Sequence, residues 1–181
     1  MQTMTVSDTE RMAMALDGEY VRHGNAWHHI DRIPNATLRA ETFRAEIAPA
    51  HIVAKLSAAW VHGAAAFPRR LDLYCDRDRR ADVRDRSTQR LTTTAVPADD
   101  TDDLGGVVVT SRLRTALDLL TGEEWHAELV ASTRLLLEPE GDRRESVSRG
   151  VSERLTAYSA KKRQGAVRRL NEVYSLTRYT S

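Results

Sequence analysis

The chain has 181 residues, of which 41% are hydrophobic, so it can form one domain with its own core and is not a wholly disordered chain. No stretch reaches the roughly 18 apolar residues of a membrane span, and the first ten residues lack the apolar run of a secretory signal. The single cysteine excludes an internal disulfide. We therefore expect a cytoplasmic protein. Its net charge of +1 is unevenly distributed, because residues 72–103 carry −3 and residues 143–181 carry +7.

The N-terminal part predicts a short helix followed by a β-hairpin. Residues 6–16 favour the helix. In residues 18–31 two β-prone runs flank the pair Gly24-Asn25, which is a hairpin signal. Pro34 ends this unit.

Two helices and then a series of strands are expected in the middle of the chain. The first helix starts at Thr37 and stops at Pro49, and Ser57 caps a second, short helix that Gly63 closes. Strands are predicted at residues 71–75, 91–96 and 107–109. In the first strand Leu71, Leu73 and Cys75 lie on one face. A charged connection at residues 76–90 and an acidic loop at residues 98–103 join the strands.

The C-terminal part predicts helices only. Thr110 or Ser111 caps the first of them, and Gly122 ends it. Further helices are expected at residues 123–137, 144–158 and 161–176, with Leu155, Tyr158, Val167, Leu170 and Tyr174 buried. The fold class is therefore α+β: a small sheet of three to five strands packed with about five or six helices, and an all-helical C-terminal part.

No residue pattern indicates a metal site or a cofactor. The six histidines include the adjacent pair His28 and His29, which would point to opposite faces of a strand, and His23 lies across the hairpin from them. No cysteine or second histidine cluster completes a set of ligands. We interpret His62, which lies near apolar residues, as a packed and hydrogen-bonded side chain and not as a base.

Signatures of catalysis are missing as well, so we expect no enzyme. No serine lies in a nucleophile-elbow pattern. Cys75 lies on an expected strand and suits a small buried hydrophobe. The pair Gly105-Gly106 precedes a strand and so matches no phosphate-binding loop, and the mixed charges of residues 76–80 suit a solvated loop.

Two segments suit contacts with nucleic acid. One is the hairpin tip, where Arg22, His23 and Asn25 could touch backbone phosphates as a wing does. The other is the basic helix that carries Lys161, Lys162, Arg163, Arg168 and Arg169; residues 161, 165, 168 and 169 share a face at helical spacing. An ordinary solvated helix surface is the alternative reading of the second segment.

Two longer motifs complete the sequence pattern: SAAWVHG at residues 57–63 and VTSRLRTALDLL at residues 109–120. In the second motif Arg114 and Asp118 stand four residues apart and could pair. As a pair, about fifty residues apart, the motifs resemble the AbiEi-type antitoxin family of actinobacteria, and the resemblance covers roughly residues 18–176. The residues that we expect to define this fold are Ser57, Trp60, His62, Gly63, Thr110, Ser111, Arg114, Thr115 and Asp118.

The resemblance implies a winged helix followed by an α/β regulatory domain. Only seventeen residues precede Gly18, whereas a full winged helix needs about fifty. We therefore expect residues 1–35 to be a remnant of that module and residues 36–181 to form the regulatory domain.

The resemblance also implies a function, that of an antitoxin-like transcriptional regulator. Its expected partners are operator DNA, a nucleotidyltransferase-like toxin, or both, and a homodimer would compensate for a small DNA-contacting surface. The alternative is a protein-interaction module, a truncated antitoxin that neutralises or senses a toxin without binding DNA.

Overall fold

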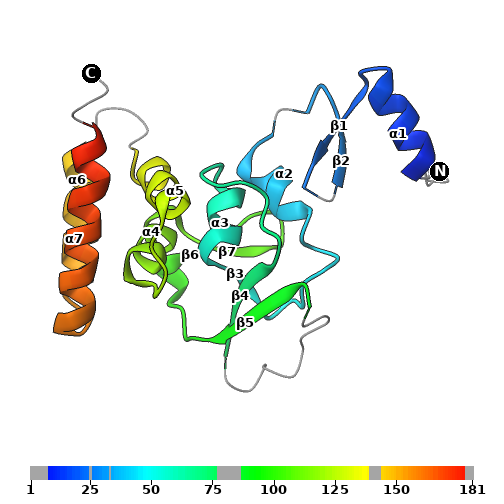
Figure 1. Cartoon of the computed structure of the whole chain (residues 1–181). Coiled ribbons are helices and arrows are strands. Elements are labelled where there is room, and N and C mark those ends of the chain that lie inside the picture. The colour runs from blue at the N-terminus through cyan, green and yellow to red at the C-terminus, as the bar shows by residue number, and fades with distance from the viewer. Residues whose placement is uncertain (1–7, 25, 33, 77–86, 139–143, 178–181) are drawn as a thin grey trace.

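A computed structural model describes residues 8–24, 26–32, 34–76, 87–138 and 144–177 (Figure 1). It confirms the α+β fold class, with one sheet of two strands, a second sheet of five strands, and helices alone from residue 112 to the C-terminal end of the described chain.

The predicted N-terminal helix and hairpin are present. Helix α1 (Asp8–Leu16) precedes the antiparallel strands β1 (Tyr20–His23) and β2 (Ala26–His29), which lie at the N-terminal end of the molecule in Figure 1. Gly24, at the tip of the hairpin, has a φ of +61°, and a Cβ atom there would overlap the ring of Phe67. The hairpin tip is therefore packed against the rest of the chain.

The five-stranded sheet is mixed and has the order β5-β4-β3-β7-β6. Its central strand, β3, is antiparallel to β4 and parallel to β7. Every residue of β4 is buried, including the two positions that were expected to face away from the core. The strands are β3 (Ile52–Val53), β4 (Leu71–Cys75), β5 (Gln89–Thr93), β6 (Thr101–Asp103) and β7 (Val108–Thr110).

The prediction of an acidic loop at residues 98–103 was wrong. A short 3-10 helix, Ala98–Asp100, leads into the edge strand β6, which pairs antiparallel with β7. The turn between the two strands contains Gly105 and Gly106, both with positive φ. Acidic side chains are tolerated on β6 because an edge strand exposes them to water.

Two predictions about the middle helices also need correction. The helix expected between Thr37 and Pro49 is α2 (Ala36–Glu41), capped by Asn35, whose side chain accepts a hydrogen bond from Leu38. Ser57 does not cap the next helix, α3 (Lys55–Val61), because it lies inside that helix. Its hydroxyl instead accepts a 2.8 Å hydrogen bond from the backbone N–H of Asp72 on β4.

The C-terminal helices pack around α4, which contacts α3, α5, α6 and α7. Ser111 is the N-cap of α4, and α5 begins four residues later than the predicted start at residue 123. One apolar core lies among these helices and a second lies between the sheet and α2 and α3. The bounds are α4 (Arg112–Thr121), α5 (Ala127–Leu137), α6 (Arg144–Leu155) and α7 (Ala160–Thr177).

Helix α7 buries a different face from the one that was predicted. Val167 and Tyr174 were expected to be buried, but they are 43% and 37% exposed. The buried side chains of this helix are Ala166, Leu170 and Val173, which lie three or four residues apart on one face. The small Ala166 was not recognised as a core position because alanine suits either environment.

We expect Gly165→Ala to stabilise the protein by about 0.5–1 kcal/mol, because glycine inside a helix has an entropic cost that alanine lacks. A Cβ atom at Gly165 meets no other atom within 4 Å, so the methyl group fits. Urea unfolding measures the change. The matched control, Gly24→Ala, should destabilise the protein because of its positive φ and the contact with Phe67; a loss of stability in Gly165→Ala would contradict the prediction.

Candidate functional site

The two sequence motifs meet where α3 ends and β7 turns into α4. The Nε2–H of His62 donates a 2.7 Å hydrogen bond to the backbone carbonyl of Thr110. The hydroxyls of Thr110 and Thr115 lie 2.7 Å apart, and both threonines are fully buried. Burial lowers the pKa of His62, which favours the neutral imidazole. His62 is thus packed and hydrogen-bonded, and its one proton is used in a structural contact.

The C-terminal end of α3 is held by arginines from two other segments. Arg112 donates to the carbonyls of His62 and Leu135, at 3.4 and 2.8 Å. Arg39 donates to the carbonyl of Val61 and lies next to Gly63, whose φ is +77°. Arginines at a helix C-terminus satisfy carbonyls that have no partner within the helix.

Trp60 belongs to an aromatic cluster on the other side of the same helix. Its ring centroid lies 5.1 Å from that of Phe43 and 5.0 Å from that of Phe67. The geometry of both motifs is therefore that of residues that join secondary-structure elements.

A buried group of charges surrounds Arg114. Its Nε lies 2.9 Å from a carboxylate oxygen of Asp118, as the i, i+4 spacing predicted, and its Nη1 lies 3.0 Å from a carboxylate oxygen of Asp100. Arg154 of α6 forms a second ion pair with Asp100. The side chains of Arg114, Asp100 and Asp118 are each no more than 11% exposed. We call Arg114, Asp100, Asp118 and Arg154 the ionic cluster.

Burial dominates the electrostatics around this cluster. It raises the pKa of Asp118, although Arg114 and Tyr74 both oppose that rise. Burial and the neighbouring Asp118 raise the pKa of Tyr74, over whose ring the cationic groups of Lys55 and Arg114 lie, at 5.7 and 5.9 Å. Asp72, on the same strand as Tyr74, also has its pKa raised by burial. The ion-pair partner of Asp72 is Arg90, at 3.8 Å.

Sequence reasoning missed Asp100, Arg154 and Tyr74 as members of this region. Asp100 stands fourteen residues before Arg114 and Arg154 forty residues after it, and neither spacing is a signal of contact. Only the helical i, i+4 pair could be predicted from spacing.

The other candidate residues lie apart. His28 is buried and His29 is exposed, which agrees with opposite faces of a strand. Within the described residues no three His, Cys, Asp or Glu side chains form a group that could hold a metal ion. Cys75 is buried, as expected. Asn25, the side chain of His23 and most of the charged segment 76–80 lie outside the described residues.

The hairpin tip is far from the basic helix, because β1–β2 and α7 lie at opposite ends of the molecule (Figure 1). Arg22 donates to the carbonyl of Gly24 at 3.1 Å and lies over the ring of Trp27 at 6.0 Å. The structure therefore does not bring the two expected DNA-contacting segments together.

The five cations of the basic helix fall into two groups. Arg169 is directed inward, donates to the carbonyls of Leu120 and Gly122 at 2.9 and 2.7 Å, and lies 5.1 Å from the ring of Trp125. It caps the end of α4 and is partly buried, so its hydrogen bonds are made within the fold. The exposed cations are Lys161, Lys162, Arg163 and Arg168, and no ion pair joins them to an acid of the described chain.

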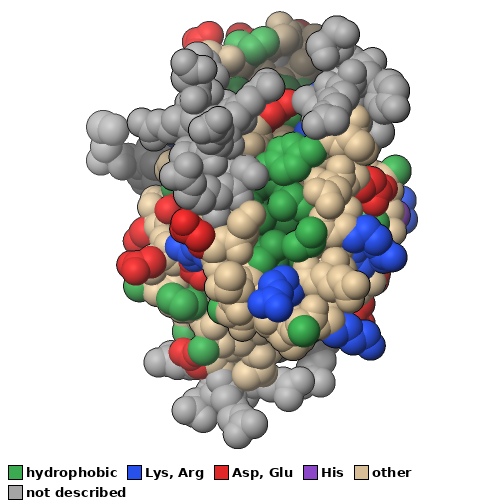
Figure 2. Space-filling view, turned by 90° about the vertical axis from the view of Figure 1, so that its left-hand side faces the viewer, with side chains coloured by type: hydrophobic (Ala, Val, Ile, Leu, Met, Phe, Trp, Pro, Cys, Tyr) green, Lys and Arg blue, Asp and Glu red, His purple; other side chains and the backbone are tan. Residues whose placement is uncertain are grey.

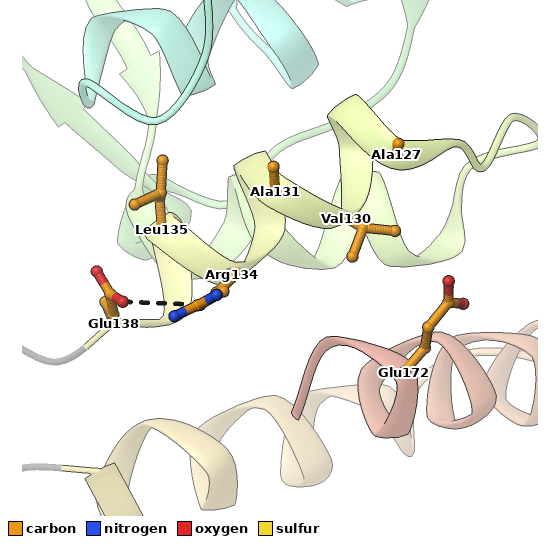
Figure 3. Close-up of a pocket in the computed structure, with 7 residues that line it drawn as sticks. All are labelled: Ala127, Val130, Ala131, Arg134, Leu135, Glu138 and Glu172. Carbon is orange, nitrogen blue, oxygen red and sulfur yellow. Dashed lines mark ion pairs between the residues drawn. The ribbon is translucent and has the colours of Figure 1, made fainter. Parts of the chain in front are cut away.

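An apolar strip with basic side chains near it runs down the face of the molecule that carries α6 and α7 (Figure 2). Val167 and Tyr174 are exposed apolar residues of α7. A groove of about 430 Å³ lies between α5 and α7 (Figure 3). Its lining residues are Ala127, Val130, Ala131, Arg134, Leu135, Glu138 and Glu172.

We expect Arg114→Met to lower the free energy of unfolding by about 3–5 kcal/mol, because it leaves two buried carboxylates without their shared cation. The control is Arg134→Met, which removes a partly exposed i, i+4 partner 3.9 Å from Glu138 and should cost less than about 1 kcal/mol. Urea unfolding of both variants tests this. Similar losses in the two variants would show that the cluster has no special role.

None of the described helices is both long enough and apolar enough to cross a membrane. We compared the chain with protein-family models, with curated proteins and with solved structures, and no match was found in any of the three comparisons. The function must therefore be argued from the geometry of this chain.

Proposed function

We propose that this chain is a non-catalytic, antitoxin-like transcriptional regulator of the cytoplasm that binds the phosphate backbone of its operator DNA through the start of α7. The two motifs that resemble the AbiEi-type antitoxins suggest the regulatory role. The observation that carries the proposal is the group of four exposed cations, Lys161, Lys162, Arg163 and Arg168, which we call the basic end of α7.

The position of these cations is unfavourable for the isolated helix. Lys161, Lys162 and Arg163 occupy its first turn, where the macrodipole is positive, and each cation there costs about 0.3–1 kcal/mol. An external polyanion would reverse this cost, because the helix dipole and the cations would then attract the same phosphates. B-DNA offers such phosphates densely along both strands.

The fold presents the basic end of α7 to solvent in a fixed orientation. Arg169 attaches α7 to the end of α4 and Glu172 accepts a 2.8 Å hydrogen bond from the indole N–H of Trp125. Both contacts lie on one side of the helix. The hairpin contributes less to this proposal, because its tip is packed against Phe67.

We expect the double variant Lys161→Gln/Lys162→Gln to bind DNA about tenfold more weakly than the wild type at about 50 mM salt, since two phosphate contacts are lost. The slope of log K against log salt should become shallower by about 2. Fluorescence anisotropy with duplex DNA from the protein's own promoter, at about 50 and 200 mM salt, measures both quantities.

The control for this experiment is Arg22→Gln, which removes a cation from the other candidate segment and should leave the affinity unchanged. Absence of binding by the wild type at low salt rules out the DNA proposal. A large effect of Arg22→Gln with none of the double variant would instead assign DNA binding to the hairpin.

The second candidate function is a protein-interaction module that neutralises or senses a nucleotidyltransferase-like toxin without DNA. The groove between α5 and α7 favours it, because exposed apolar surface in a concave site suits a protein partner. Co-purification with the product of the neighbouring gene, after nuclease treatment, distinguishes this candidate from DNA binding.

A further inference from the structure

Helix α5 is apolar on two opposite sides. Its inner side buries Leu129, Leu136 and Leu137 against the helical core. Its outer side exposes Ala127, Ala131 and Leu135, which stand at i, i+4 and i+8 and so form one stripe. Contiguous apolar residues on an exposed surface often mark a site where a partner binds. The outer stripe of α5 therefore has the character of a surface that is covered when the protein functions.

The groove beside this stripe is lined along the whole length of α5. Helix α5 has eleven residues and is about 16 Å long, which corresponds to three helical turns. Ala127 and Ala131 are small enough to let another backbone approach closely, and Leu135, which is 44% exposed, projects at one end (Figure 3). Helix α7 forms the opposite wall, where Glu172 projects toward Val130 (Figure 3).

Among the described residues that line the groove, two are acidic and one is basic. Glu138 and Glu172 line it, and Glu128 is exposed in the first turn of α5. Arg134 is the one cation among the described lining residues, and it lies 3.9 Å from Glu138. Arg112 donates to the backbone carbonyl of Leu135 and so approaches the groove at its other end. An occupant with cations beside an apolar stripe would therefore be complementary in charge as well as in shape.

We propose that the groove between α5 and α7 binds a basic amphipathic helix of a partner protein. The apolar stripe of the partner helix packs on Ala127, Ala131 and Leu135, and its lysines or arginines lie near Glu138 and Glu172. This mode of binding is the insertion of one helix into the groove of another protein. It uses surface that is separate from the basic end of α7, so it holds whether or not the chain binds DNA.

Two designed peptides test the proposal on the full chain. The first is an amidated helical peptide of about 14 leucine and lysine residues with leucine along one face, and the second replaces every lysine by glutamate. Fluorescence anisotropy measures binding at about 150 mM salt. We expect the basic peptide to bind about tenfold or more tightly than the acidic one, because only the basic peptide is complementary to the acidic rim.

A pair of variants identifies the surface that is used. Leu135→Arg introduces a cation into the groove and should weaken binding of the basic peptide about tenfold. Val167→Arg is the matched control, because Val167 is 43% exposed and Leu135 is 44% exposed, and Val167 does not line the groove. Circular dichroism establishes that both variants are folded. Equal affinities of the two variants for the basic peptide would mean that the attraction is unspecific and would overturn the proposal.

Two other outcomes also contradict it. Tighter binding of the acidic peptide at the groove would reverse the assigned charge of the partner. Light scattering after gel filtration that shows a dimer of the wild type and a monomer of Leu135→Arg would make a second copy of the chain the occupant. Loss of DNA binding in Lys161→Gln/Lys162→Gln affects neither result, so the two proposals succeed or fail separately.

Discussion

The arrangement of the C-terminal half depends on one guanidinium group. Arg114 lies on α4 and pairs with Asp118 of the same helix and with Asp100, which immediately precedes the edge strand β6. Arg154 of α6 reaches the same Asp100. A charge that is removed from water needs a partner, so these residues can be buried only together. The edge of the sheet, α4 and α6 are thereby fixed relative to one another, and α7, which packs on α4, takes its position from them.

Local patterns predicted the parts of this structure that depend on neighbours in sequence. The hairpin followed from the Gly24-Asn25 pair, and the pair Arg114–Asp118 followed from helical spacing. Of the two cap residues that the sequence offered, Thr110 and Ser111, the structure uses Ser111. The remainder depends on contacts between distant segments. An edge strand such as β6 tolerates acidic side chains, and so does a loop. The acidic sequence of residues 101–103 therefore cannot distinguish an edge strand from a loop.

Two adjacent residues of α7 also show what sequence patterns cannot predict. Arg168 and Arg169 have the same chemistry and differ by about 100° in their direction around the helix. One is exposed to solvent, while the other caps α4 and lies over Trp125. Which of them is available to a partner depends on the rotation of the helix, and the packing of Ala166, Leu170 and Val173 determines that rotation. The groove beside α5 could not be predicted either, because its two walls are about forty residues apart in the chain.

The contact between the hairpin tip and Phe67 joins the N-terminal unit to the aromatic cluster around Trp60. The Phe67 ring, which lies against the hairpin tip, is stacked on Phe43 and meets Trp60 edge to face. Trp60 lies two residues before His62, which is bonded to the start of α4 through Thr110. The hairpin tip is thereby connected to the start of α4 through Phe67, Trp60, the backbone of α3 and His62, although the two lie in different parts of the molecule.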